Sequence, residues 1–158
     1  MYQILKPYLW AAFLSTLPVT ELRGAIPWVL SLYEAQPWLV MIAACIGNII
    51  PAIILLWGLD LIAGIDDQES RNPVRRSINW VLDRTRRRTE KKVLQYGYLA
   101  LLLFVAIPLP GTGAWTGAMA AWLFGLRKKP ALLIISLGVI LAGIIVTLIT
   151  TGVINILV

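Results

Sequence analysis

The sequence contains no histidine and only one cysteine, Cys45. Without histidine, the chain offers no imidazole ligand for a metal, no Ser-His or Cys-His nucleophile pair and no histidine proton relay. One cysteine cannot form an intramolecular disulfide, and its place inside an apolar run is typical of a small core residue. We therefore expect no metal site and no cofactor, and we do not expect an enzyme.

Charge is also scarce. Only 14% of the 158 residues are charged, 59% are hydrophobic, and the mean hydropathy is +0.80. Such a chain cannot surround an apolar core with a polar surface, so it is predicted to be a multi-pass protein of the cell membrane, in contact with membrane lipids. One small bundle has little surface with which to enclose a substrate, and we expect a homodimer.

Two apolar runs, residues 38–59 and 131–153, contain no charge and are long enough to cross a membrane, which takes about 20 helical residues. Each follows a proline, Pro37 or Pro130, which the first turn of a helix accepts. These two runs are the predicted transmembrane helices.

The segment between them, residues 66–92, carries nine basic residues against five acidic ones. By the positive-inside rule it is cytoplasmic, as is the basic cluster 127–129. In segment 66–92, apolar residues recur near helical spacing among the arginines. This suits a basic amphipathic helix on anionic lipid, or a simple topology anchor, rather than a nucleic-acid-binding module. The apolar segment between residues 93 and 126 therefore begins and ends on the same side.

Both remaining apolar segments are interrupted near their middle. The arms 94–107 and 112–126 are about 14 residues each, or about 21 Å of helix, which is too short to cross. Arms 8–17 and 24–33 flank a similar break at residues 18–23. We interpret each segment as a re-entrant hairpin, although Lys6 favours the alternative of an inside N-terminus and a true crossing.

The predicted fold is an all-α integral membrane protein forming one domain of two inverted repeats. Each repeat contains a re-entrant helical hairpin and one transmembrane helix, within residues 1–65 and 93–158, and the basic segment 66–92 joins them. Broken helices at membrane depth are tolerated where protein or a water-filled cavity surrounds them, so a matched pair indicates a binding site between the two halves.

Glu21 and Arg23 lie at the first break, where a charge costs about 2.5 to 3.5 kcal/mol on the more lenient insertion scale. Half-helix N-termini following both breaks, together with Arg23, would favour a phosphate or carboxylate, with Glu21 coupling a proton or cation. The alternatives are a charge pair that only pins the hairpins together and a surface turn. The candidate site residues are Pro18, Thr20, Glu21, Arg23, Gly24, Pro27, Asn48, Pro108, Pro110, Gly111, Thr112, Gly113 and Gly117.

The motifs at residues 21–27 and 107–118 closely resemble those of the small multi-drug export protein family, and the resemblance covers nearly the whole chain. That family looks related to the DedA superfamily, which implies two re-entrant hairpins, handling of lipid phosphates, and a central site at Glu21, Arg23 and residues 108–117. DedA proteins place an arginine in the second hairpin, and this chain has none between residues 93 and 126.

Three functions follow from these patterns. The first is a transporter, flippase or scramblase for an anionic amphiphile or lipid carrier phosphate, with or without proton coupling. The second is an exporter of cationic drugs that uses Glu21 as the membrane carboxylate. The third is a membrane assembly protein that transports nothing.

Overall fold

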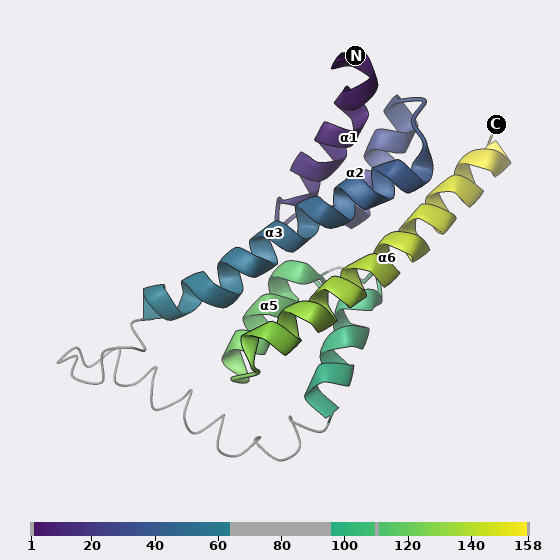
Figure 1. The fold of residues 1–158 in the computed structure, drawn as a ribbon. Coiled ribbons are helices and arrows are strands. Elements are labelled where there is room, and N and C mark those ends of the chain that lie inside the picture. Colours follow the sequence, from purple (N-terminus) through teal and green to yellow (C-terminus); the bar gives the residue numbers. More distant parts are fainter. Residues whose placement is uncertain (1, 64–95, 110, 158) are drawn as a thin grey trace, which may run out of the picture.

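The computed structural model describes residues 2–63, 96–109 and 111–157, and these residues form helices without strands (Figure 1). In chain order the helices are α1 (Tyr2–Ser15), α2 (Glu21–Leu32), α3 (Pro37–Ala63), an unlabelled helix (Tyr96–Ala106), α5 (Ala114–Leu123) and α6 (Lys128–Leu157). The all-helical prediction is therefore confirmed. The basic segment 66–92 and Pro110 lie outside the described residues.

Two helices are long and apolar enough to cross a membrane, over Pro37–Leu59 in α3 and Lys128–Ile154 in α6. They include both runs predicted from the sequence. Pro37 begins α3 and Pro130 lies in the first turn of α6, where a missing backbone N–H leaves no intrahelical hydrogen bond unmade. α3 and α6 pack against each other and run in opposite directions (Figure 1).

The first interrupted segment forms two packed helices, α1 and α2, joined by a turn at Thr16–Thr20. The Thr20 hydroxyl donates a hydrogen bond to the Leu14 carbonyl at 2.5 Å, which ties the turn to the end of α1. The break was predicted at residues 18–23 but ends earlier, because Glu21 and Arg23 belong to the first turn of α2. An acidic residue there is favoured by the partial positive charge of a helix N-terminus.

The second interrupted segment joins the Tyr96–Ala106 helix to α5 through a turn that contains two glycines with positive φ. Gly111 has φ 80° and Gly113 has φ 145°, both values that side-chain-bearing residues rarely adopt. Gly113 occupies the N-cap position of α5. The second arm therefore begins at Ala114, two residues later than predicted.

The two turns approach each other near the middle of the molecule, while the N-terminus and C-terminus lie at the same end (Figure 1). Beside each turn lies a long helix, α3 or α6, in which a glycine closely approaches a neighbouring helix. A Cβ on Gly47 of α3 would overlap the backbone of Ala12 in α1, and a Cβ on Gly138 of α6 would lie 2.8 Å from Val105 Cβ. Small residues at such contacts permit close helix packing in membranes. The re-entrance and the inverted repeat remain predictions.

Candidate functional site

Groups from both turns meet in a small region between α2 and α5. The Trp115 indole Nε1–H of α5 donates a hydrogen bond to the Thr16 carbonyl in the first turn at 3.1 Å. In the opposite direction, Glu21 and Arg23 extend from the start of α2 to the second turn. The region where the two turns touch is therefore held by contacts in both directions.

Arg23 bonds to five oxygen atoms of the second turn. Its Nη1 donates to the carbonyls of Leu109 and Thr112, and to the Thr112 hydroxyl at 2.8 Å. Its Nη2 donates to the carbonyls of Val105 and Ile107, each at 3.2 Å. Four of these oxygens are backbone carbonyls and the fifth is a hydroxyl, so neutral groups accept all of these hydrogen bonds between the turns.

Glu21 takes the other end of the same turn. Its side chain is buried, with 6% of its surface exposed, and its Oε1 accepts the Trp115 backbone N–H at 3.4 Å, in the first turn of α5. A Cβ on Gly113 would overlap this carboxylate, so only glycine leaves it room. Glu21 itself has φ 45°, a conformation that costs a non-glycine residue about 1 kcal/mol or more and tends to occur at functional sites.

The two charges therefore contact opposite helix ends of the second hairpin. Glu21 lies at the N-terminus of α5, which carries partial positive charge, and Arg23 lies at the C-terminal carbonyls that follow Val105, which carry partial negative charge. At positions i and i+2 the two side chains do not face each other on a helix, and each uses a different partner. The sequence-based alternative was a charge pair that only pins the hairpins together, whereas the hydrogen bonds of each charge go to the second hairpin.

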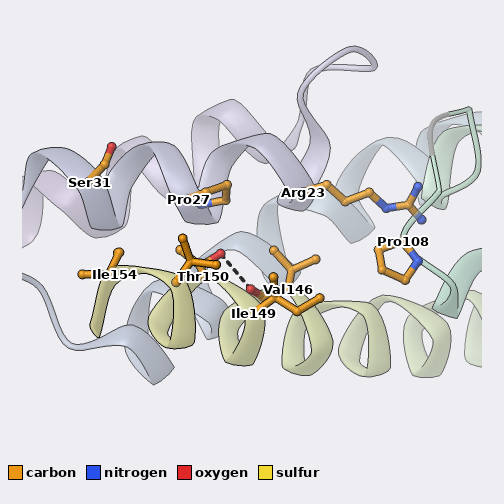
Figure 2. Close-up of a pocket in the computed structure, with 9 residues that line it drawn as sticks. Arg23, Pro27, Ser31, Pro108, Val146, Ile149, Thr150 and Ile154 are labelled. Atoms are coloured by element: carbon orange, nitrogen blue, oxygen red, sulfur yellow. Dashed lines mark hydrogen bonds between the residues drawn. The ribbon is translucent and has the colours of Figure 1, made fainter. Parts of the chain in front are cut away.

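A groove with a volume of about 490 Å³ opens beside Arg23, between α2 and α6 (Figure 2). Arg23 and Pro108 lie at one end, and most of the rest is apolar; the lining residues are Arg23, Pro27, Ser31, Pro108, Val146, Ile149, Thr150, Val153 and Ile154. The Thr150 hydroxyl donates to the Val146 carbonyl at 2.7 Å within α6, as the dashed line in Figure 2 shows. The groove thus combines a long apolar wall with one cationic side chain.

Residues 21–145 match a protein family described as putative small multi-drug export protein. The chain belongs to this family. No curated protein and no solved structure matches the chain. Together with the two long apolar helices, membership of a small multi-drug export family points to a membrane protein and agrees with a transporter at a general level.

In this small multi-drug export family member, the structure brings together four of the predicted site residues, Glu21, Arg23, Thr112 and Gly113. Pro27 and Pro108 line the adjoining groove. Of the other predicted residues, Pro18 and Gly111 are exposed. Gly24 donates a backbone hydrogen bond to Thr20, and Gly117 packs near Val105. Asn48 is buried, and its Oδ1 has no hydrogen-bond partner among the described residues.

Several residues take part through their backbone. Val105 and Ile107 lie outside the predicted site, whereas Leu109 and Trp115 fall within the range 108–117 that the family resemblance implies, without an assigned role. Val105, Ile107 and Leu109 have apolar side chains, and only their carbonyls face Arg23. Trp115 contributes its backbone N–H and its indole N–H. Pro108 was the one available signal, because a proline next to a helix end leaves nearby carbonyls without an intrahelical donor.

Proposed function

We propose that this chain is a membrane transporter whose gate is the contact between the two turns. In this proposal the α1–α2 hairpin and the hairpin of Tyr96–Ala106 with α5 re-enter the membrane from opposite faces, as inverted repeats. The observation that carries the proposal is the position of Arg23, which both ties the turns together and lines the groove. A ligand in the groove would therefore contact the same side chain that holds the two turns together.

The groove favours an amphiphile. Its volume of about 490 Å³ falls within the range of about 300 to 1,000 Å³ that is usual for ligand sites, and its wall is largely apolar. An apolar chain along Val146, Ile149 and Val153 would place the head of the molecule near Arg23. A phosphate or carboxylate head is the best match for that charge, which supports an anionic amphiphile or lipid carrier phosphate as the substrate.

An anionic head would also have the means to open the gate. A phosphate or carboxylate head carries the opposite charge and can accept two parallel N–H groups from the guanidinium, so it competes for Arg23 with the neutral carbonyls of the second turn. Once Arg23 turns to the head, the two turns lose its hydrogen bonds and keep those of Glu21 and Trp115. In this proposal Glu21 couples substrate movement to protons. The protein acts as a homodimer in the cell membrane.

Export of cationic drugs is the second candidate, and one observation favours it. The Glu21 carboxylate is buried beside Gly113 in a segment with few charges, which is how a membrane carboxylate for a cationic substrate would be kept. The two candidates differ in the sign of charge that the protein moves.

Proteoliposomes containing the purified chain distinguish these functions. The probes are dodecyl phosphate, dodecyltrimethylammonium and the uncharged dodecyl maltoside, which share one chain length. We expect saturable movement of dodecyl phosphate that Arg23→Gln removes and Arg127→Gln retains, because Arg127 is an exposed charge outside the groove. Saturable movement of the ammonium compound alone, lost in Glu21→Gln, would establish the cationic candidate, and no saturable movement of any probe would contradict the transporter.

Re-entrance is tested by labelling single cysteines with a membrane-impermeant reagent, after replacement of Cys45. Positions near Gln36 and both termini are expected to react from outside, and positions near Asn72 and Lys128 only from inside. If position 2 reacted only from the cytoplasm while position 36 stayed external, the first hairpin would instead cross the membrane.

A further inference from the structure

The Tyr96–Ala106 helix ends in such a way that several carbonyl oxygens near its last turn face Arg23. The last carbonyls of a helix lack intrahelical donors, and Pro108 has no N–H with which to extend the ladder. The Leu109 N–H, which in a continued helix would reach the Val105 carbonyl, donates to Ile107 at 2.8 Å instead. The Val105 carbonyl is thus left to Arg23.

The contacts of Arg23 use only the terminal part of its side chain. Nη1 and Nη2 together carry four N–H groups and face five oxygens, whereas Nε is buried without a partner. Leu109 and Thr112 also donate to the Ile107 and Leu109 carbonyls, but a carbonyl oxygen has two lone pairs and can accept from Arg23 as well. The stem that links the guanidinium to α2 adds no hydrogen bond. A free guanidinium ion placed at the same position would make the same contacts.

The groove supplies a route to this position. Arg23 and Pro108 are both part of its lining, and Figure 2 shows the Arg23 side chain extending from α2 toward the turn that carries Pro108. A substituent on the cation would leave along the apolar wall formed by Pro27 and Val146. A ligand bound at the oxygens is thus not enclosed by the protein.

We propose that the oxygens of Val105, Ile107, Leu109 and Thr112 form a guanidinium-binding site that Arg23 occupies as a tethered ligand and that a free alkylguanidinium can occupy in its place. Planar donors on two nitrogens suit oxygens spread along a turn, whereas an ammonium group carries its three donors on one atom. The site should therefore prefer guanidinium to ammonium. This inference does not depend on the transport function, because it concerns binding alone.

The test measures binding of methylguanidinium and methylammonium to the purified full chain in lipid nanodiscs by titration calorimetry. In Arg23→Ala the site is vacant, and we expect methylguanidinium to bind at least about tenfold more tightly than it binds to the unmodified chain, a difference of about 1.4 kcal/mol. Methylammonium should bind Arg23→Ala at least about tenfold more weakly than methylguanidinium does. Adding Thr112→Val, which deletes one of the five oxygens, should weaken methylguanidinium binding severalfold.

If Arg23→Ala does not fold on its own, chemical rescue tests the same site. Recovery of folded Arg23→Ala only when methylguanidinium is present during purification, and not with methylammonium, would support the site by chemical rescue. If no condition recovers Arg23→Ala, the same binding comparison is made with Arg23→Gln, whose polar side chain is too short to occupy the position of the Arg23 guanidinium. Equal affinity in variant and unmodified chain, equal affinity for the two cations, or no binding to a folded variant would each overturn the proposal.

Discussion

The two turns of this chain have similar outlines and opposite chemistry. The first presents two charged side chains, Glu21 and Arg23, from the beginning of a helix. The second presents backbone groups, which are the carbonyls near Pro108 and the N–H of Trp115, and glycines that leave room for them. Side-chain charges of one turn therefore meet backbone dipoles of the other, and a substitution in either turn should change the stability of the contact between them.

The largest effect is expected for Arg23→Gln. The amide cannot supply the four terminal N–H groups of Arg23, so carbonyls of the second turn lose their partners, and hydrogen bonds to charged groups are worth about 1.5 to 3 kcal/mol each. We expect a loss of about 3 kcal/mol in the free energy of unfolding, measured by thermal or denaturant unfolding in detergent. Arg23→Lys should fall in between, because lysine keeps the charge without the planar fork. A Gln variant as stable as the parent would show that the contact between the turns has no energetic weight.

Gly113→Ala should come next, and Gly111→Ala is its matched control. Both glycines have positive φ, which costs a side-chain-bearing residue about 1 to 3 kcal/mol, but only the Cβ at position 113 would overlap Glu21, whereas nothing lies within 4 Å of a Cβ at position 111. The excess loss at position 113 should shrink when Glu21→Ala is added. A double-mutant cycle on unfolding free energies measures that coupling, and purely additive effects would rule out the steric link.

Glu21→Gln should have a smaller effect on stability and a specific effect on transport. The amide oxygen can still accept the Trp115 N–H, so the loss is the charge at the N-terminus of α5, worth about 0.5 to 1 kcal/mol. If Glu21 couples protons, the pH dependence of substrate movement in proteoliposomes should disappear in this variant. An unchanged pH profile in an active Glu21→Gln protein would leave a passive scramblase as the better account.

The smallest effect is expected for Thr112→Val. It removes one hydroxyl that accepts from Arg23, while the four carbonyls that bind the guanidinium remain. We expect a loss of about 0.5 kcal/mol in the free energy of unfolding, by the same unfolding measurement as for Arg23→Gln. A loss as large as that of Arg23→Gln would mean that the hydroxyl, and not the set of carbonyls, holds the two turns together.

Much of the arrangement could be predicted because it depends on residue types that are rare in apolar sequence. Glu21, Arg23 and Pro108 stand out for that reason, and the long helices α3 and α6 follow from their composition. Thr112 was among the predicted site residues, but the carbonyls of Val105 and Ile107 could not be predicted as partners of Arg23, since a carbonyl oxygen belongs to every residue and leaves no mark in the sequence. The contribution of α6 to the groove was missed for a related reason, because apolar residues facing a groove look the same as those facing lipid.

The start of α2 was misplaced because the sequence shows charges and a proline without showing how they are satisfied. Glu21 and Arg23 were assigned to the break at residues 18–23, because polar and helix-breaking residues interrupt the apolar run there. Their partners lie in the other hairpin, some 80 to 95 residues along the chain, so α2 can begin at Glu21 while its charges are still paired. Only the folded arrangement reveals such distant partners.

The close approach of Gly47 to Ala12 also sets how far this sequence can drift over time. Every other amino acid adds at least a Cβ, which would overlap the backbone of α1, so substitution at position 47 requires a compensating shift of a whole helix. Gly58, in the same helix, has nothing within 4 Å of a Cβ and faces no such restriction. Among descendants of this chain, we expect position 58 to vary freely while position 47 stays glycine.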